Sequence, residues 1–267
     1  TGEPQTITIT PQNLGSEVLL TVTKQNYYRY SRKLNVIPTT GPYLVFNSCE
    51  INDQNANGQL DFKEDATLNV SIHNVGFQSI QNVTAVLTSD SPYVEIGSAI
   101  TTYTSLSPDE IVNNTNAFSI RVLDGVPDQE VIRFQLTMTN GVDVFTDNFS
   151  LKVNSPEFEV TKLVIRDMDD NVIDRLFKME QAKLTYTVKN SGHSNSNAVR
   201  SILMLDAPVI DYENYIFDVD GIDANDSVDV SFVIRVLEEA PDGAIIADHV
   251  TVESGDYSSG YSSEIPL

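Results

Sequence analysis

Polar and apolar residues alternate along many short stretches of this chain. The alternation is clear at Thr6–Thr10, Leu68–His73, Glu157–Val160 and Leu184–Lys189, where β-branched and aromatic residues are common. A period of two residues places the apolar side chains on one face of an extended strand, and that face is then buried. No stretch repeats apolar residues with helical spacing over three turns. The sequence therefore predicts an all-β fold.

Two sequence landmarks occur twice, at almost the same spacing. His73-Asn74-Val75-Gly76 corresponds to Lys189-Asn190-Ser191-Gly192, 116 residues later. Ile120-Arg121-Val122-Leu123 recurs as Ile234-Arg235-Val236-Leu237, 114 residues later. A unit of this length is about the size of one sandwich domain and far longer than a solenoid repeat. The repeat predicts tandem immunoglobulin-like β-sandwiches.

The repeat divides the chain into three parts, with boundaries at Gly41-Pro42 and Asn154-Ser155-Pro156. Residues 42–154 and 155–267 are predicted to be the two sandwiches, the second a degenerate repeat of the first. Residues 1–41 are too few to form a sandwich of their own. We interpret them as strands, either the tail of a preceding immunoglobulin-like domain or a hairpin packed on the first sandwich.

The twelve residues from Asp53 to Glu64 match the spacing of a calcium-binding loop. Gly58 stands at the sixth position, where the loop turns sharply, and Leu60 stands at the eighth, where it anchors the loop to the core. A hard cation needs six to eight oxygen ligands, and alternate residues of a tight loop point their oxygens inward. The predicted Ca²⁺ ligands are Asp53, Asn55, Asn57, Gln59 through its backbone carbonyl, Asp61, and Glu64 as a bidentate ligand.

This loop joins two predicted strands, Leu44-Val45-Phe46 and Leu68-Asn69-Val70, rather than two helices. The alternative interpretation is a polar surface turn that binds nothing, but such a turn needs neither the closing Glu64 nor the apolar Leu60. Three acidic ligands beside two neutral asparagines favour an affinity of the extracellular class, on the order of 10⁻⁴ to 10⁻⁵ M, and a structural ion.

The corresponding segment of the second repeat, residues 169–180, lacks much of this pattern. Asp169 and Asn171 occupy the first and third positions, and Glu180 occupies the twelfth. The glycine and two ligands are replaced, at positions six, five and nine, by Asp174, Ile173 and Phe177. A cation there would keep too few oxygens, so we predict no tight site in this segment.

The chain is strongly acidic, with 16 Lys and Arg against 38 Asp and Glu and a formal net charge of −22. Such a surface repels phosphate backbones, so nucleic acid is not an expected partner. Cys49 is the only cysteine, so no intramolecular disulfide can form. No apolar run approaches the roughly 18 residues of a transmembrane segment, and the start at Thr1 is typical of a mature or truncated protein. These features favour a secreted or cell-surface protein, of bacterial rather than eukaryotic type.

Residues that could carry catalysis do not form a recognisable set. Cys49 and His73 are candidates for a nucleophile and its base. However, alternation places Cys49 on the strand face of Tyr43, Val45 and Ile51, which is typical of a core cysteine.

The other ionisable candidates are weaker. His193 and His249 lack a second His or Cys at the spacing of metal ligands. Glu238-Glu239 and Asp169-Asp170 are typical of solvated turns rather than of paired glycosidase carboxylates. We therefore predict that the chain is not an enzyme.

Two tyrosine clusters leave a ligand-binding function open. Tyr27-Tyr28-Arg29-Tyr30 and Tyr257–Tyr261 could stack on sugars or contact a partner protein. Tyrosine on strands is more often a packing residue, and tryptophan is absent from the chain. A carbohydrate- or protein-ligand-binding module is thus the alternative to a structural role, and an aromatic patch on one sheet face would favour it.

Several stretches of the first 153 residues form a recognisable series. They are Leu19–Thr23, Asn26-Tyr27, Tyr30, Val36–Pro38, Gly41–Val45, Leu68–Gly76, Ser91–Val94 and Asn116–Phe118. In this order they resemble the immunoglobulin-like domain that follows the catalytic domain of gingipain-type (family C25) cysteine peptidases, and the adhesion-type module that commonly follows it in secreted Bacteroidetes proteins. The remaining residues match only through the internal repeat.

The resemblance implies a non-catalytic part of a larger secreted or surface-anchored, peptidase-like protein. The catalytic domain would lie upstream of this chain, and residues 1–41 would be a fragment of the intervening immunoglobulin-like domain. We therefore expect a calcium-stabilised structural or adhesion module, accessory to a gingipain-like peptidase. Its partners would be the neighbouring domains of the larger protein and a host or cell-surface protein or glycan.

Overall fold

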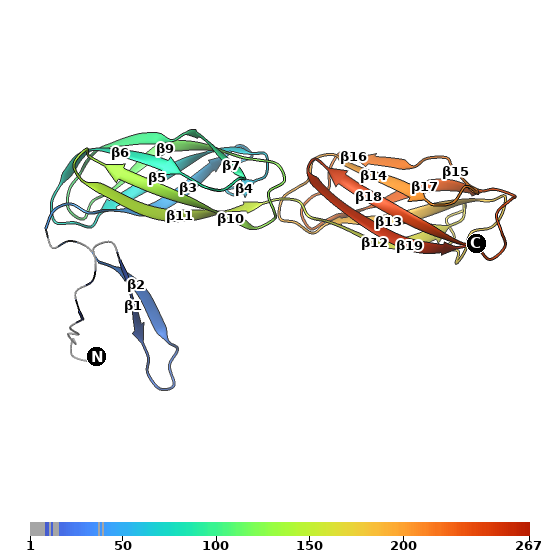
Figure 1. The fold of residues 1–267 in the computed structure, drawn as a ribbon, viewed down its shortest axis with the longest axis horizontal. Coiled ribbons are helices and arrows are strands. Elements are labelled where there is room, and N and C mark those ends of the chain that lie inside the picture. Colours follow the sequence, from blue (N-terminus) through green and yellow to red (C-terminus); the bar gives the residue numbers. More distant parts are fainter. Residues whose placement is uncertain (1–8, 11, 13–15, 37, 39) are drawn as a thin grey trace.

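The computed structural model describes residues 9, 10, 12, 16–36, 38 and 40–267. Within these residues the chain forms 19 β-strands and no helix, which confirms the predicted all-β class. Of the predicted strand Thr6–Thr10, residues 6–8 lie outside the described residues, while Ile9 and Thr10 are not in a strand. Figure 1 shows two elongated bodies of packed sheets placed end to end, with a separate hairpin on the N-terminal side.

The first sandwich contains nine strands. They are β3 (Leu44–Asp53), β4 (Leu60–Asp61), β5 (Asp65–Asn74), β6 (Ile80–Thr88), β7 (Val94–Ser98), β8 (Ile100–Leu106), β9 (Ile111–Val122), β10 (Glu130–Thr139) and β11 (Val144–Asn154). One sheet has the order β3-β5-β9-β7 and the other the order β4-β11-β10-β6-β8. The short β4 pairs with β11 in parallel, whereas the other neighbours are antiparallel.

The second sandwich repeats this plan with eight strands. They are β12 (Phe158–Arg166), β13 (Gln181–Asn190), β14 (Val199–Leu205), β15 (Ile210–Tyr212), β16 (Ile216–Val219), β17 (Ser227–Val236), β18 (Ile245–Ser254) and β19 (Tyr257–Pro266). The two sheets have the orders β12-β13-β17-β15 and β16-β14-β18-β19.

The N-terminal hairpin consists of β1 (Glu17–Val22) and β2 (Tyr30–Asn35), which form a two-stranded sheet by themselves. Figure 1 shows it projecting away from the two sandwiches. A hairpin without a third strand is marginally stable at best in water. The interpretation of residues 1–41 as the tail of a preceding domain stays a prediction.

Each sandwich has its own hydrophobic core between its two sheets. The equivalent strands β5 and β13 run through the middle of one sheet in each case, and their alternate side chains point into the core. The fully buried side chains of these two strands are Leu68, Val70, Ile72, Leu184, Tyr186 and Val188. Burial of each such side chain contributes about 1.5–3 kcal/mol, so the alternation in the sequence is the main source of this architecture.

The side of β3 on which the Cys49 side chain lies depends on an irregularity in the strand, which the alternation of the sequence does not predict. Between Phe46 and Ser48 the pairing of β3 with β5 shifts by one residue, which is a β-bulge. Phe46 therefore shares the core side with Cys49 and Ile51. The prediction that Cys49 packs on the core is confirmed, but Val45 was wrongly placed on the same face.

The repeated Asn-x-Gly motif lies at the end of β5 in the first sandwich and at the end of β13 in the second. In the first sandwich the side chain of Asn74, which is fully buried, accepts hydrogen bonds from the N–H groups of Tyr43 (3.1 Å) and Gly76 (3.1 Å). Its Nδ2 donates to the carbonyls of Gln78 (2.8 Å) and Leu106 (3.2 Å). One amide thus satisfies four backbone groups that come from three separate segments.

Asn190 forms the same four bonds in the second sandwich. Its Oδ1 accepts from the N–H groups of Glu157 (3.2 Å) and Gly192 (3.1 Å), and its Nδ2 donates to the carbonyls of Ser194 (2.9 Å) and Ile222 (3.0 Å). Both glycines must lack a side chain here. A Cβ on Gly76 would lie 2.6 Å from the Gly41 carbonyl oxygen, and one on Gly192 would lie 2.5 Å from the Glu157 nitrogen.

Candidate metal centre

The predicted calcium loop connects β3 to β5 at the end of the first sandwich that faces the second. Leu60 is completely buried, and with Asp61 it forms β4, which pairs with Val153 and Asn154 at the end of β11. Gly58 has a φ of +76°, a conformation that glycine adopts without strain. The apolar anchor and the glycine turn therefore stand where the twelve-residue spacing requires them.

Asp61 lies at the centre of the loop and is only 7% exposed. Its Oδ2 accepts hydrogen bonds from the side-chain amides of Asn55 (3.0 Å) and Asn57 (2.8 Å). Its Oδ1 is buried and has no hydrogen-bond partner. The side chains of two other predicted ligands thus converge on this carboxylate, whose Oδ1 still lacks a partner.

Glu64 is the second buried acid of the loop, with 5% of its surface exposed. Its Oε1 accepts from the N–H of Asn55 (3.3 Å) and its Oε2 from the N–H of Asp61 (3.0 Å). Burial raises the pKa of Glu64, and the negative charges of Asp61 and Asp53 raise it further, although the two N–H donors oppose the shift. The charged form of the Glu64 carboxyl is therefore unfavourable in this loop unless a cation binds there.

The remaining predicted ligands, Asp53 and Gln59, shape the loop in another way. Asp53 Oδ2 accepts from the N–H groups of Gly58 (2.8 Å) and Gln59 (3.2 Å). The Gln59 side chain turns away from the loop, and its Oε1 accepts from Nδ2 of Asn154 (2.5 Å). The ligand role of the Gln59 backbone carbonyl stays a prediction, and the side-chain contact with Asn154 was not foreseen.

The predicted acidic ligands have no basic partner in the described part of the chain. Among the described residues, no Lys, Arg or His forms an ion pair with Asp53, Asp61 or Glu64, and Lys63 pairs instead with Asp124 (2.5 Å). In the described part of the chain, no three His, Cys, Asp or Glu side chains are gathered as a ready-made metal cluster. The carboxylates accept the loop's own N–H groups, and calcium binding would require the amides of Asn55 and Asn57 to rotate and present their oxygens.

The corresponding segment of the second sandwich has basic partners. Lys183 Nζ lies 2.6 Å from Asp170 Oδ1, and Arg175 lies 3.3 Å from the Asp174 carboxylate. Glu180, the counterpart of Glu64, is exposed. The prediction of no tight site in this segment stays a prediction, but two of its carboxylates, Asp170 and Asp174, already have cationic partners.

The residues considered for catalysis do not come together. Burial raises the pKa of Cys49 to about 12, with a smaller effect from Glu50, so its thiolate is scarce at neutral pH. The His73 ring pairs with Asp109 (3.0 Å), and the His249 ring hydrogen-bonds to the Ser262 hydroxyl (2.7 Å). Each has a local surface partner unrelated to the others.

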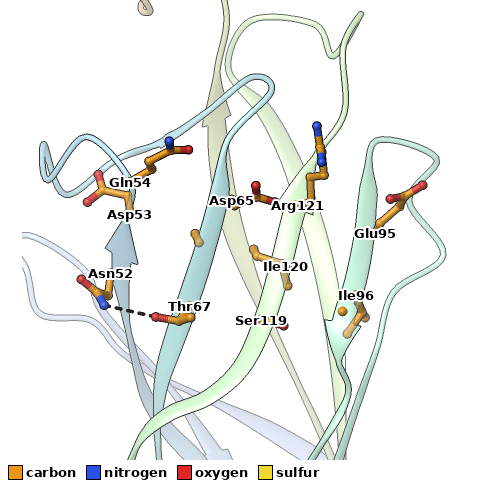
Figure 2. Close-up of a pocket in the computed structure, with 12 residues that line it drawn as sticks. Asn52, Asp53, Gln54, Asp65, Thr67, Glu95, Ile96, Ser119, Ile120 and Arg121 are labelled. Carbon is orange, nitrogen blue, oxygen red and sulfur yellow. Dashed lines mark hydrogen bonds between the residues drawn. The ribbon is translucent and has the colours of Figure 1, made fainter.

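An open groove of about 790 Å³ lies on the sheet β3-β5-β9-β7, and Figure 2 shows the residues that line it. Thr67 and Ser119 lie toward one end of it, and Asp65, Arg121 and Glu95 lie toward the other. None of the described residues that line this groove is aromatic, so it does not provide the stacking surface that the ligand-binding alternative requires.

The two tyrosine clusters differ in their surroundings. Tyr27 and Tyr28 in the β1–β2 connection and Tyr30 at the start of β2 are exposed, Tyr28 completely. Tyr257 and Tyr261 instead pack against the hydrophobic cores, Tyr257 against both. Only the first cluster is open to a partner.

No described segment forms a helix with the length and hydropathy needed to cross a membrane. No protein-family model matches the chain, and comparison with curated proteins gives no match.

Distant likenesses exist among solved structures. The C-terminal domain of the AgI/II polypeptide BspA of Streptococcus agalactiae is 7% identical, with a TM-score of 0.40, over 82% of this chain and 99% of that chain. Red sea bream transglutaminase is 10% identical, with a TM-score of 0.34, over 83% of this chain and 31% of that chain. Likenesses at this level carry no argument about function.

Proposed function

We propose that this chain is a non-catalytic structural or adhesion module of a secreted or cell-surface protein, stabilised by one Ca²⁺ ion in the loop from Asp53 to Glu64. The observation that carries the proposal is Asp61, a buried carboxylate with one unpartnered oxygen beside the buried Glu64. An uncompensated buried charge is costly. A calcium ion would remove that cost by binding the carboxylate oxygens directly.

The loop carries enough oxygens for this ion. Asp61 and Glu64 provide carboxylates from the buried side, and rotation of the Asn55 and Asn57 amides brings two neutral oxygens to the same place. The full proposed ligand set is Asp53, Asn55, Asn57, the Gln59 carbonyl, Asp61 and Glu64. A set with three charges suits a calcium concentration near 1 mM, and therefore an extracellular setting.

Calorimetric titration and thermal unfolding of three proteins test the calcium site. Wild type is expected to bind one Ca²⁺ and to gain about 2.7 kcal/mol of stability when free calcium is about 100 times the Kd. Glu64→Gln should lose both effects because it removes the bidentate ligand. Glu180→Gln, the same substitution at the equivalent position of the second sandwich, is the matched control and should keep them. Absence of calcium binding by wild type, or an equal response from Glu64→Gln, would overturn the proposal.

The surface role rests on other features. The two sandwiches lie end to end as a rod (Figure 1), which suits a module that spaces or presents a neighbouring domain, and the net charge of −22 suits a calcium-rich exterior. The gingipain-like context is supported by the sequence resemblance alone. An antibody to this chain should detect a larger polypeptide on intact source cells or in their medium, and exclusive detection inside the cells would contradict the proposal.

The second candidate function is ligand binding through the hairpin tyrosines. The full exposure of Tyr28, with Tyr27 and Tyr30 nearby, is the observation that favours it, because an exposed aromatic cluster is a common contact surface. A glycan array and a binding screen with host-surface protein, run with wild type and Tyr28→Ala, would test it. A signal that Tyr28→Ala abolishes would favour this function, and blank results would leave the structural one.

A further inference from the structure

The candidate calcium loop holds the segment that connects the two sandwiches. This linker is short: β11 ends at Asn154 and β12 begins at Phe158. The Phe62 N–H donates to the Asn154 carbonyl (3.0 Å), and the Gln59 side chain accepts from the Asn154 amide (2.5 Å). Asn154 and Ser155 are both buried. The conformation of the loop therefore fixes the point at which the chain leaves the first sandwich.

The same loop also contacts the second sandwich directly. The ring of Phe62 meets the ring of Tyr257 edge to face, with centroids 5.3 Å apart. The Tyr257 hydroxyl donates to the Val126 carbonyl of the first sandwich (3.0 Å). A Cβ on Gly255 would lie 3.0 Å from Lys63 Nζ, so the turn between β18 and β19 lies close against the loop.

Asp128 makes a second connection across this junction. Its Oδ1 accepts from the N–H groups of Ser155 (3.0 Å) and His193 (3.2 Å), and its Oδ2 lies 2.6 Å from the His193 ring. Burial raises the pKa of Asp128, but the N–H donors and His193 more than offset it, so the pKa lies below its usual value. Asp128 thus brings the 193–197 loop of the second sandwich next to the candidate calcium loop.

Between these two loops lies a cavity of about 520 Å³. Asp61 and Glu64 line it from the first sandwich, and Asn197 lines it from the second. The backbone carbonyl of Asn197 is held by the Ser254 hydroxyl (3.3 Å). Among the described residues, the Asn197 side-chain amide has no hydrogen-bond partner, so its oxygen is available to a ligand in the cavity.

We propose that the calcium ion bridges the two sandwiches, with the Asn197 side-chain oxygen as an additional ligand, bound directly or through one water. This inference rests on the calcium site proposed above and extends it across the junction. The buried, unpartnered oxygen of Asp61 provides the charge, and the cavity provides the opening toward Asn197. Calcium binding then stiffens the junction as well as the loop.

Two substitutions at Asn197 test the bridge by calorimetric titration of the full chain with CaCl₂. Asn197→Ala removes the oxygen and is expected to weaken calcium binding about tenfold, the lower end of the range usual when a group that supports a metal site is lost. Asn197→Asp adds a charged ligand at the same place and is expected to tighten it. Ile245→Asp, which adds a carboxylate at an exposed position at the opposite end of the same sandwich, is the matched control and should bind as wild type does.

A distance measurement tests the stiffening. Spin labels at Val142→Cys and Val172→Cys, both exposed, in a Cys49→Ser background report the distance between the outer ends of the two sandwiches. Calcium is expected to narrow the distance distribution, and Asn197→Ala is expected to prevent the narrowing at calcium concentrations that saturate wild type.

The outcomes separate the two proposals. The bridge is overturned if neither Asn197 substitution changes calcium affinity, or if calcium leaves the distance distribution between the spin labels unchanged. In either case the proposed loop site is not affected. Absence of calcium binding by wild type overturns both. Asn197-dependent affinity together with narrowing supports the bridge.

Discussion

The loop at residues 53–64 and the segment at residues 169–180 share one backbone frame. In each, the carbonyl of the closing glutamate accepts from the N–H of a valine in the neighbouring strand, at 2.9 Å and 3.1 Å. In each, the residue before that glutamate has a positive φ, and a leucine four residues before the glutamate is buried. The equivalent residues are Glu64 and Glu180, Val122 and Val236, Lys63 and Met179, and Leu60 and Leu176.

The two segments differ in how they balance charge. In the second, Lys183 and Arg175 pair with the segment's own carboxylates, and Glu180 faces solvent. In the first, Asp61 and Glu64 are buried, and no basic residue pairs with them among those that the structure describes. In the second copy, basic side chains of the chain itself balance two of the carboxylates, and in the first copy we propose that a free Ca²⁺ ion does so. The first copy is the one that lies between the sandwiches (Figure 1).

The largest expected effect on stability concerns the Asn-x-Gly corner, which is present in both sandwiches. Asn74→Ala and Asn190→Ala each leave four backbone groups without their partner, and each is expected to cost about 3 kcal/mol of stability. Scanning calorimetry with and without calcium measures the loss. Equal losses in the two variants would confirm that the Asn-x-Gly corner has the same role in both sandwiches, while a loss below about 1 kcal/mol in either would contradict it.

The next largest effect is a pH dependence of stability that comes from Glu64 in the first loop. Because the pKa of Glu64 is raised in the folded protein, the folded state binds a proton more readily than the unfolded state in the window just above the unfolded pKa. Without calcium, the contribution of Glu64 to stability should therefore rise as the pH falls through its raised pKa. With calcium the trend should reverse, since protons compete with the ion for Glu64.

Urea unfolding in EDTA and in calcium, at several values between about pH 7 and pH 4, measures this dependence. The same series on Glu64→Gln isolates the contribution of this one carboxyl from those of the others. If the variant and wild type show the same slopes in both buffers, the raised pKa of Glu64 has no role in stability.

The smallest effect belongs to the second segment. Lys183→Ala removes the ion pair with Asp170, and an exposed pair of this kind is worth at most about 0.5–1 kcal/mol. It should also leave calcium stoichiometry at one, because the segment still lacks the glycine and two ligands. Urea unfolding and calcium titration check both points. A second bound calcium in this variant would show that charge balance alone, and not ligand spacing, separates the two copies.

The sequence was most informative where one residue determines one local feature. Alternation predicted β5 and β13, the repeat predicted two similar units, and the loop spacing predicted that Leu60 would be a buried anchor. The bulge between Phe46 and Ser48 could not be predicted, because it depends on the pairing of two strands and leaves no mark in the alternation.

Contacts between distant segments were also missed. Tyr257 was considered as a ligand-binding residue, but it packs between the two cores. The side-chain bond between Gln59 and Asn154 joins residues that are far apart in the sequence. The first contact depends on how the two sandwiches are placed, and the second depends on how β4 pairs with β11 within the first sandwich. A single sequence carries no pattern for either arrangement.

The buried linker has a mechanical consequence. A pull along the chain reaches the second sandwich through residues 154–157, whose backbone is held by Asp128 on one side and Asn190 on the other. The load would pass into hydrogen bonds from both sandwiches before it reached either core. The joint would then transmit tension between the two bodies instead of extending as a loose tether does.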